Sequence, residues 1–239
     1  MLGRTVGVIA VLSLGLVLPA AAQQPPDAAA GKTDHAAAVK ESLQESMAAL
    51  RQYQWVETTA VSVKGEEKSR TQSTCYYGAD GKLQKTPLGA PPQDEGRKPR
   101  GIRGKIVESK KEEMSEAAKE AVALVKQYVP PDPARIQAAK EGGKLTLTPP
   151  DSKGQVQLVI KDYLKPGDSL TLDVNAASDR ISGMTVATFT DSAKEAVGLK
   201  VAFGGFADGT VYPATIHLQV AAQNLAVAIE NSGYKKLGG

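Results

Sequence analysis

The last third of the chain, residues 155–236, constrains the fold most, because it alternates between short strand-like runs and turns. Val156, Leu158 and Ile160 recur at every second position of one run, and Pro166-Gly167-Asp168 then turns the chain. Each run has one apolar and one polar face, as in an antiparallel sheet solvated on one side. Such a sheet needs a cover for its apolar face. Strands are predicted at residues 144–148, 156–160, 170–174, 181–189, 199–203, 212–220 and 225–229.

Three predicted helices supply that cover. The first runs from His35 to about Tyr53 with one apolar stripe, and the second, Lys110 to Val129, has a broad apolar face. The third has Asp132 as its N-cap, Pro133 at its first helical position and Gly142 just past its end. Its apolar face is thin, which favours a brace or a flap over a core element.

The segment between the first two helices predicts three further strands. Residues 55–63 alternate with a period of two and are rich in β-branched side chains, and residues 70–77 and 82–86 return as a meander. We therefore expect one α+β domain over residues 34–236. Its antiparallel sheet is expected to be strongly curved and open, an unclosed barrel, with helices over the concave face.

The N-terminal residues are typical of an export signal. Arg4 is followed by an apolar run over residues 6–18 and by Pro19-Ala20-Ala21-Ala22, a small-residue cleavage site. The alternative is a membrane anchor, but the run is shorter than the roughly 20 residues that a spanning helix needs. The sequence predicts a signal peptide at residues 1–22 and a disordered leader at 23–33. The mature protein would be exported, soluble and, in a diderm bacterium, periplasmic.

A predicted loop at residues 87–109 is rich in proline, glycine and positive charge. It is interpreted either as a solvated loop or as a contact for an envelope protein or an anionic membrane surface. Aromatic residues are not interleaved with the cations, so nucleic acid is not an expected partner. The cations that would make the contact are Arg97, Lys98, Arg100, Arg103 and Lys105.

The sequence predicts no enzyme, cofactor or metal site. Cys75 is the one cysteine, so it has no disulfide partner within the chain, and its strand pattern predicts a buried thiol. His35 and His217 are the two histidines, and with one cysteine they do not match a zinc site. Neither a nucleophile elbow nor a glycine-rich phosphate loop occurs.

Three stretches carry a family resemblance. They are the helix-to-strand junction Tyr53-Gln54-Trp55, the lid-like helical pair from Lys110 to Gly142, and the strand entry Gly209-Thr210-Val211-Tyr212-Pro213. With this order of elements over nearly the whole mature chain, the sequence resembles the LolA-like family of periplasmic lipoprotein-sorting proteins. The resemblance implies an unclosed barrel with a helical lid over a hydrophobic cavity that accepts acyl chains.

The functional hypothesis is a non-catalytic carrier or sensor that binds an apolar chain, from a lipid or lipoprotein, between sheet and helices. The alternative is that the same side chains fill a core, and that the protein is an envelope scaffold or interaction module without a small-molecule ligand. A scaffold would use the basic loop or a sheet edge. The predicted lining of the ligand site is Trp55, Val61, Leu124, Tyr128, Leu172, Met184, Phe203 and Leu218.

The export signal gives a direct prediction. Cleavage after Ala22 leaves Gln23 as the first residue of the protein isolated from cells. N-terminal sequencing or intact mass measurement reads this directly. A chain that still begins at Met1 would contradict the prediction.

Overall fold

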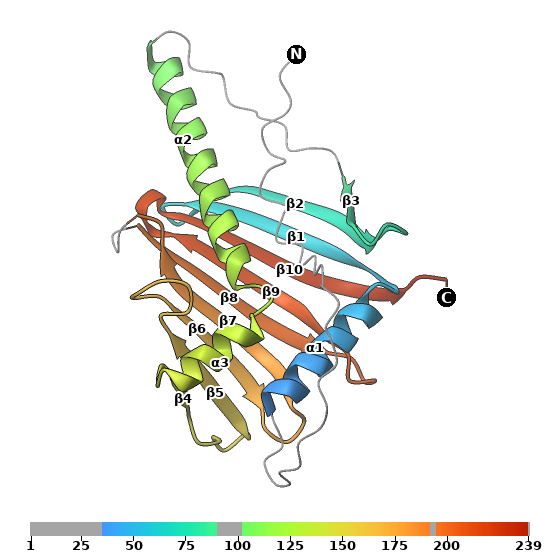
Figure 1. Cartoon of the computed structure of the whole chain (residues 1–239). Helices are drawn as coiled ribbons and strands as arrows, with labels where there is room; N and C mark the ends of the chain where they lie inside the picture. The colour runs from blue at the N-terminus through green and yellow to red at the C-terminus, as the bar shows by residue number, and fades with distance from the viewer. Residues whose placement is uncertain (1–34, 90–101, 192–194, 239) are drawn as a thin grey trace, which may run out of the picture.

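The computed structural model describes residues 35–89, 102–191 and 195–238, and in these residues three α-helices lie on one face of a ten-stranded antiparallel sheet (Figure 1). The strand order is β3-β2-β1-β10-β9-β8-β7-β6-β5-β4. Strands β3 and β4 are therefore the two edges, and the sheet is open. The predicted α+β class with an open sheet beneath helices is confirmed.

The elements follow the predicted order along the chain. Helix α1 precedes the first three strands, and helices α2 and α3 separate them from the remaining seven. The helices are α1 (His35–Leu50), α2 (Ile102–Val125) and α3 (Pro133–Glu141), with a 3-10 turn, η1 (Lys126–Tyr128), after α2. The strands are β1 (Tyr53–Val63), β2 (Glu66–Tyr77), β3 (Leu83–Leu88), β4 (Leu145–Leu147), β5 (Gln155–Lys161), β6 (Ser169–Asn175), β7 (Arg180–Phe189), β8 (Ala196–Gly205), β9 (Val211–Val220) and β10 (Leu225–Lys236).

Strand β1 pairs with β10, which joins the two strand groups into one sheet. The register places Val61 opposite Val227 and Thr59 opposite Ile229, so β1 continues the apolar face of the C-terminal strands. Opposite Trp55 the register shifts, and Gly233 there has φ of +62°. A bulge with a left-handed glycine bends and twists a strand, and this one lies near the end of β10.

The main core lies between the sheet and helices α2 and α3. The buried part of α2 presents Ala118, Ala121, Val122 and Val125 to the strands, which confirms the broad apolar face predicted for this helix. Small side chains let a helix approach a sheet closely and leave little space between them. The sheet side of the core is made of Ile160, Leu170, Leu172, Met184, Val186, Leu199, Leu218, Val227 and Ile229, among others.

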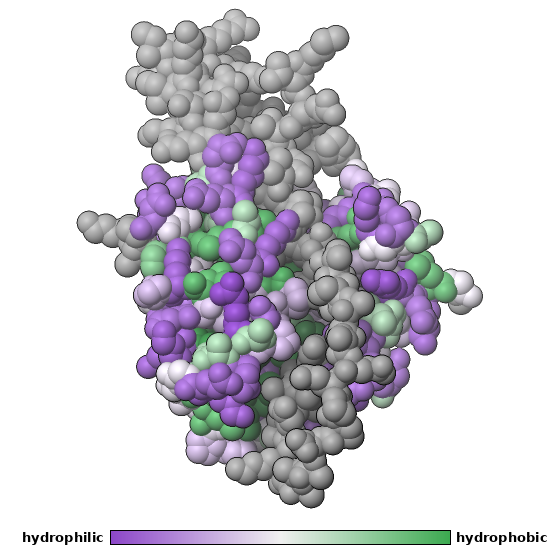
Figure 2. Space-filling view, in the orientation of Figure 1, coloured by the Kyte–Doolittle hydropathy of each residue, from purple (hydrophilic) through white to green (hydrophobic). Residues whose placement is uncertain are grey.

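The boundaries of two helices show how local chemistry sets them. Helix α2 begins at Ile102 instead of the predicted Lys110, so residues 102–109 of the predicted loop are helical. In α3, a side-chain oxygen of Asp132 accepts a hydrogen bond from the Ala134 N–H at 2.9 Å, as its N-cap role predicts. Hydrophilic residues predominate over the second part of α2 and over α3 on the face that Figure 2 shows.

A buried polar cluster fixes the end of α2 to the sheet. The Tyr128 hydroxyl in η1 donates to the Asp168 carboxylate at 2.5 Å and is hydrogen-bonded to Thr188 Oγ1 at 2.7 Å. Asp168 also accepts the backbone N–H groups of Leu164 and Lys165. Burial and the bond to Asp168 raise the pKa of Tyr128. Because Tyr128, Asp168 and Thr188 are all buried, each depends on the others for its hydrogen bonds.

This cluster gives a stability prediction. Tyr128→Phe removes a hydroxyl bonded to a buried carboxylate and should lower the free energy of unfolding by about 1.5–3 kcal/mol in urea denaturation. Tyr76→Phe is the matched control, because Tyr76 is 37% exposed, and its effect should stay within about 0.5 kcal/mol. Equal effects of the two substitutions would contradict the role of the cluster.

Candidate apolar binding site

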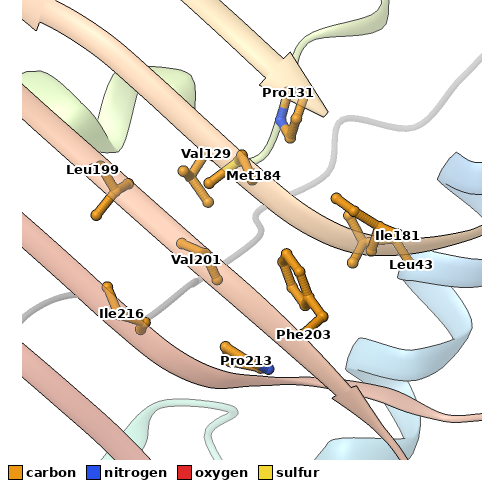
Figure 3. Close-up of a pocket in the computed structure, with 10 residues that line it drawn as sticks. All are labelled: Leu43, Val129, Pro131, Ile181, Met184, Leu199, Val201, Phe203, Pro213 and Ile216. Carbon is orange, nitrogen blue, oxygen red and sulfur yellow. The ribbon is translucent and has the colours of Figure 1, made fainter. Parts of the chain in front are cut away.

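A small cavity lies between α1, the segment that follows η1, and strands β7, β8 and β9 (Figure 3). All the side chains that line it are apolar. Residues of β7, β8 and β9 form its sheet side, and α1 and the segment after η1 approach it from the helical side. The lining residues are Leu43, Val129, Pro131, Ile181, Met184, Leu199, Val201, Phe203, Pro213 and Ile216.

An irregularity in the β8–β9 pair shapes one side of the cavity. The register shifts between Ala202 and Phe203, which brings Phe203 opposite Pro213. Pro213 lies early in β9, where a proline predicts either an edge strand or a bulge. Strand β9 lies between β8 and β10 and is not an edge, so the proline is accommodated by the bulge. The carbonyl of Pro213 accepts the Asn231 Nδ2–H at 2.9 Å. The bulge thereby aims Phe203 and Pro213 at the cavity.

Helix α1 closes the cavity on its helical side through Leu43. Leu43 reaches the lining, and α1 touches β7 and β9. The Val211 N–H donates to Ser46 Oγ at 3.0 Å, and this buried hydrogen bond joins α1 to β9. By contrast, α2 is held by its buried apolar face and by the Tyr128 cluster.

The cavity is closed to anything large in this structure. Its volume is about 20 Å³, close to the room that one water molecule needs. Ligand pockets are usually roughly 300–1,000 Å³. An apolar cavity offers water no hydrogen-bond partners, so a space of this kind stays empty. An apolar chain would fit only after the elements around the cavity move apart.

The structure distributes the predicted lining residues over three environments. Met184 and Phe203 line the cavity. Tyr128, Leu172 and Leu218 are buried in the core, and Val61 and Leu124 pack against that core partly buried. Trp55 lies outside it, hydrogen-bonded to Asn231 Oδ1 at 3.1 Å and stacked on Tyr234.

Sequence reasoning missed the helical side of the cavity. Leu43 lies on the predicted apolar stripe of the first helix, but a stripe does not show which part of the sheet it covers. Val129 and Pro131 come from the connection between two helices, where no periodic pattern marks a buried side chain. The position of Leu43 on the apolar stripe of the first helix was the one sequence signal for this side of the cavity.

The helix-facing side of β1 to β3 carries polar groups that are paired. Lys85 Nζ lies 2.7 and 2.8 Å from the two carboxylate oxygens of Glu57, and their side chains are 17% and 9% exposed. Cys75 is fully buried beside them, as predicted, and burial raises the pKa of its thiol to about 11. The thiol is therefore protonated at neutral pH. His217 is exposed, as its strand pattern predicts.

Several sequence predictions fall on residues outside the described part. The signal peptide and leader at residues 1–33 lie there, as do Arg97, Lys98 and Arg100. Arg103 and Lys105 belong to the helical backbone of α2, without a description of their side chains. Within the described ranges no cluster of three or more His, Cys, Asp or Glu residues could hold a metal ion. The described helices also include none with the length and apolar character to cross a membrane.

Comparisons with known proteins give distant likenesses of fold. No protein-family model matches the chain, and no curated protein matches its sequence. A LolA superfamily protein from Nitrosomonas europaea is similar in structure, with a TM-score of 0.36 and 11% identity, over 84% of this chain and 94% of that one. A DUF1329 family protein from Desulfovibrio piger has a TM-score of 0.34 and 7% identity over the same shares.

A third similar structure is MucB in complex with periplasmic MucA, with a TM-score of 0.22 and 9% identity, over 86% of this chain and all of that chain. The resemblance to LolA-like proteins seen in the sequence thus has a counterpart in the structure comparison, as a weak likeness. TM-scores below 0.5 carry no information about what this chain binds. Its function has to be inferred from its own residues.

The cavity makes a packing prediction. Val201→Ile adds one methylene next to a void of about 20 Å³ and should raise the free energy of unfolding by about 0.5–1 kcal/mol. Val186→Ile is the matched control: Val186 is just as buried but does not line the cavity. There the added methylene should cost about 1–3 kcal/mol through overpacking. Urea denaturation compares the two, and a loss of stability in Val201→Ile would contradict the void.

Proposed function

We propose that this chain is an exported, periplasmic, non-catalytic carrier or sensor that binds the apolar chain of a lipid or lipoprotein under helix α1. The observation that carries the proposal is a site lined by apolar side chains alone and closed by α1, whose described residues bury fewer apolar side chains than those of α2. An apolar chain gains free energy in such a site in proportion to the area it buries.

In this proposal α1 is the moving cover and α2 stays in place. Moving α1 breaks the Ser46–Val211 hydrogen bond and removes Leu43 from the lining. Moving α2 would instead expose its buried alanines and valines and separate Tyr128 from Asp168. Among the described side chains, the second movement exposes more buried apolar groups and so costs more free energy. The sequence resemblance placed the lid at residues 110–142, whereas in this proposal the lid is α1.

A second candidate function is an envelope scaffold or interaction module without a small-molecule ligand. The favouring observation is that the space beneath α2 is filled by the chain's own side chains and that the cavity under α1 holds about 20 Å³. A partner protein would then bind outside, through the basic residues 97–105 or a sheet edge. The two candidates differ in whether the purified protein takes up an apolar chain.

Uptake of a fluorescent long-chain fatty acid distinguishes them. Ser46→Ala leaves the cavity lining intact but deprives the Val211 N–H of its acceptor, so the open state becomes more populated. Because apparent affinity scales with the competent fraction, it should rise about fivefold or more. Ser182→Ala is the matched control: Ser182 Oγ bonds to Gln155 on β5, away from the cavity. Its affinity should equal that of the unaltered chain.

Val201→Phe places a ring into the cavity and should reduce uptake. If the unaltered chain takes up no fatty acid, or if all three variants bind it equally, the carrier function is wrong. Mass spectrometry of lipids that remain bound after gentle purification would identify the natural ligand.

A further inference from the structure

Six aromatic rings gather at the end of the sheet where β1 begins and where β2 and β10 end. Two of the rings, those of Tyr53 and Trp55, are buried, and the other four are half-buried. Together the six form a continuous cluster of stacked, tilted and edge-to-face contacts, with centroids between 4.4 and 5.7 Å apart. It includes the turn between β8 and β9, so it lies next to the strand positions of Phe203 and Pro213. The rings belong to Tyr53, Trp55, Tyr77, Phe206, Tyr212 and Tyr234, and we call this region the aromatic end.

Exposed cations and exposed apolar side chains surround the aromatic cluster. Lys236 Nζ lies 5.7 Å from the centre of the Tyr53 ring, and Lys235 and Arg51 are exposed beside it. The charge of Arg51 acts on Tyr77, where it opposes the rise in pKa caused by burial. Leu237 is 43% exposed, and its N–H donates to the Gln52 carbonyl at 2.7 Å, which fixes it to this end.

Acidic groups offset little of this charge. Asp208 in the β8–β9 turn is exposed; hydrogen bonds from Thr210 lower its pKa most, and the charge of Lys236 lowers it further. In the neighbouring β2–β3 turn, Lys82 and Asp80 lie 3.8 Å apart and offset each other. Arg51, Lys235 and Lys236 therefore leave the described part of the aromatic end positive.

We propose that the aromatic end docks on an anionic lipid surface. Tyrosine and tryptophan rings favour the membrane interface, because they are apolar with a polar tip. Lysine and arginine near such rings are attracted to anionic headgroups, and an exposed leucine adds apolar contact. A protein partner is the other possible occupant, but it would not require this joint presence of aromatic rings, cations and an exposed leucine.

The location gives the docking a consequence. The C-terminal end of β10 and the start of β1 lie on the same side of the molecule as the last turn of α1 (Figure 1). Docking would bring the helix that closes the apolar cavity close to the lipid. The docking itself does not depend on the proposed carrier function, because a scaffold could use the same surface.

Trp55 reports the docking, since it is the one tryptophan of the chain and lies buried in the aromatic cluster, directly behind the half-buried rings. The full chain is mixed with vesicles of phosphatidylcholine, with and without phosphatidylglycerol, that contain a brominated lipid. We expect sedimentation with the anionic vesicles, weakening as salt rises, together with quenching of Trp55 fluorescence. Sedimentation without quenching would mean that another surface docks and would overturn the proposal.

A pair of variants separates docking from other attachment. Lys235→Gln with Lys236→Gln should weaken binding to anionic vesicles about fivefold for each lysine removed. The control is Lys153→Gln with Lys161→Gln, which removes the same charge from two exposed lysines, one just before β5 and one at its end. The control should change the affinity for anionic vesicles by less than the substitutions of Lys235 and Lys236 do. Equal affinities of the two double variants contradict the proposal, because another part of the chain, such as the apolar residues 6–18, would then attach to the vesicles. So does a lack of binding to anionic vesicles.

Discussion

The pairing of β1 with β10 is the interaction on which the rest of the structure depends. Without it the chain would have two separate sheets, one of three strands and one of seven, each with an unpaired edge beside the core. The pairing makes one sheet with a continuous face for the helices, and the Trp55–Asn231 hydrogen bond joins residues 176 positions apart. It also forms the aromatic end, because Trp55 of β1 and Tyr234 of β10 stack on each other only when these strands are paired.

The described residues of α2 and α1 meet the sheet in different ways. The second half of α2 and the 3-10 turn after it are buried in the core and bonded to Asp168, so they act as a structural element. In the part of α1 whose side chains are described, residues 41–50, Leu43 lines the apolar cavity, Leu50 is buried, and Ser46 accepts a hydrogen bond from the Val211 N–H. Regions with fewer buried contacts open at lower free energy, which is the physical basis for assigning the cover to α1.

Local features of the fold could be predicted from the sequence, because local chemistry determines them. Asp132 and Gly142 bound α3, and Pro213 marks a bulge. The pairing of β1 with β10 could not be predicted, since alternation in two distant strands does not show that they are neighbours. The same limit applies to the site: Met184 and Phe203 were expected to line it, but the contribution of Leu43 depends on where α1 crosses the sheet. Cavity size depends on how side chains fill space, which periodicity does not show.

The central claim is that α1 opens while the sheet and α2 remain folded, and amide hydrogen exchange of the unliganded protein tests it most directly. The account predicts that amides of residues 41–50 exchange through a local opening, well before those of residues 118–125 in α2 and of the central strands. Addition of a long-chain fatty acid should then change protection in α1 and in β7 to β9. If the amides of α1 exchange only when the core also unfolds, with the free energy of global unfolding, the account is contradicted.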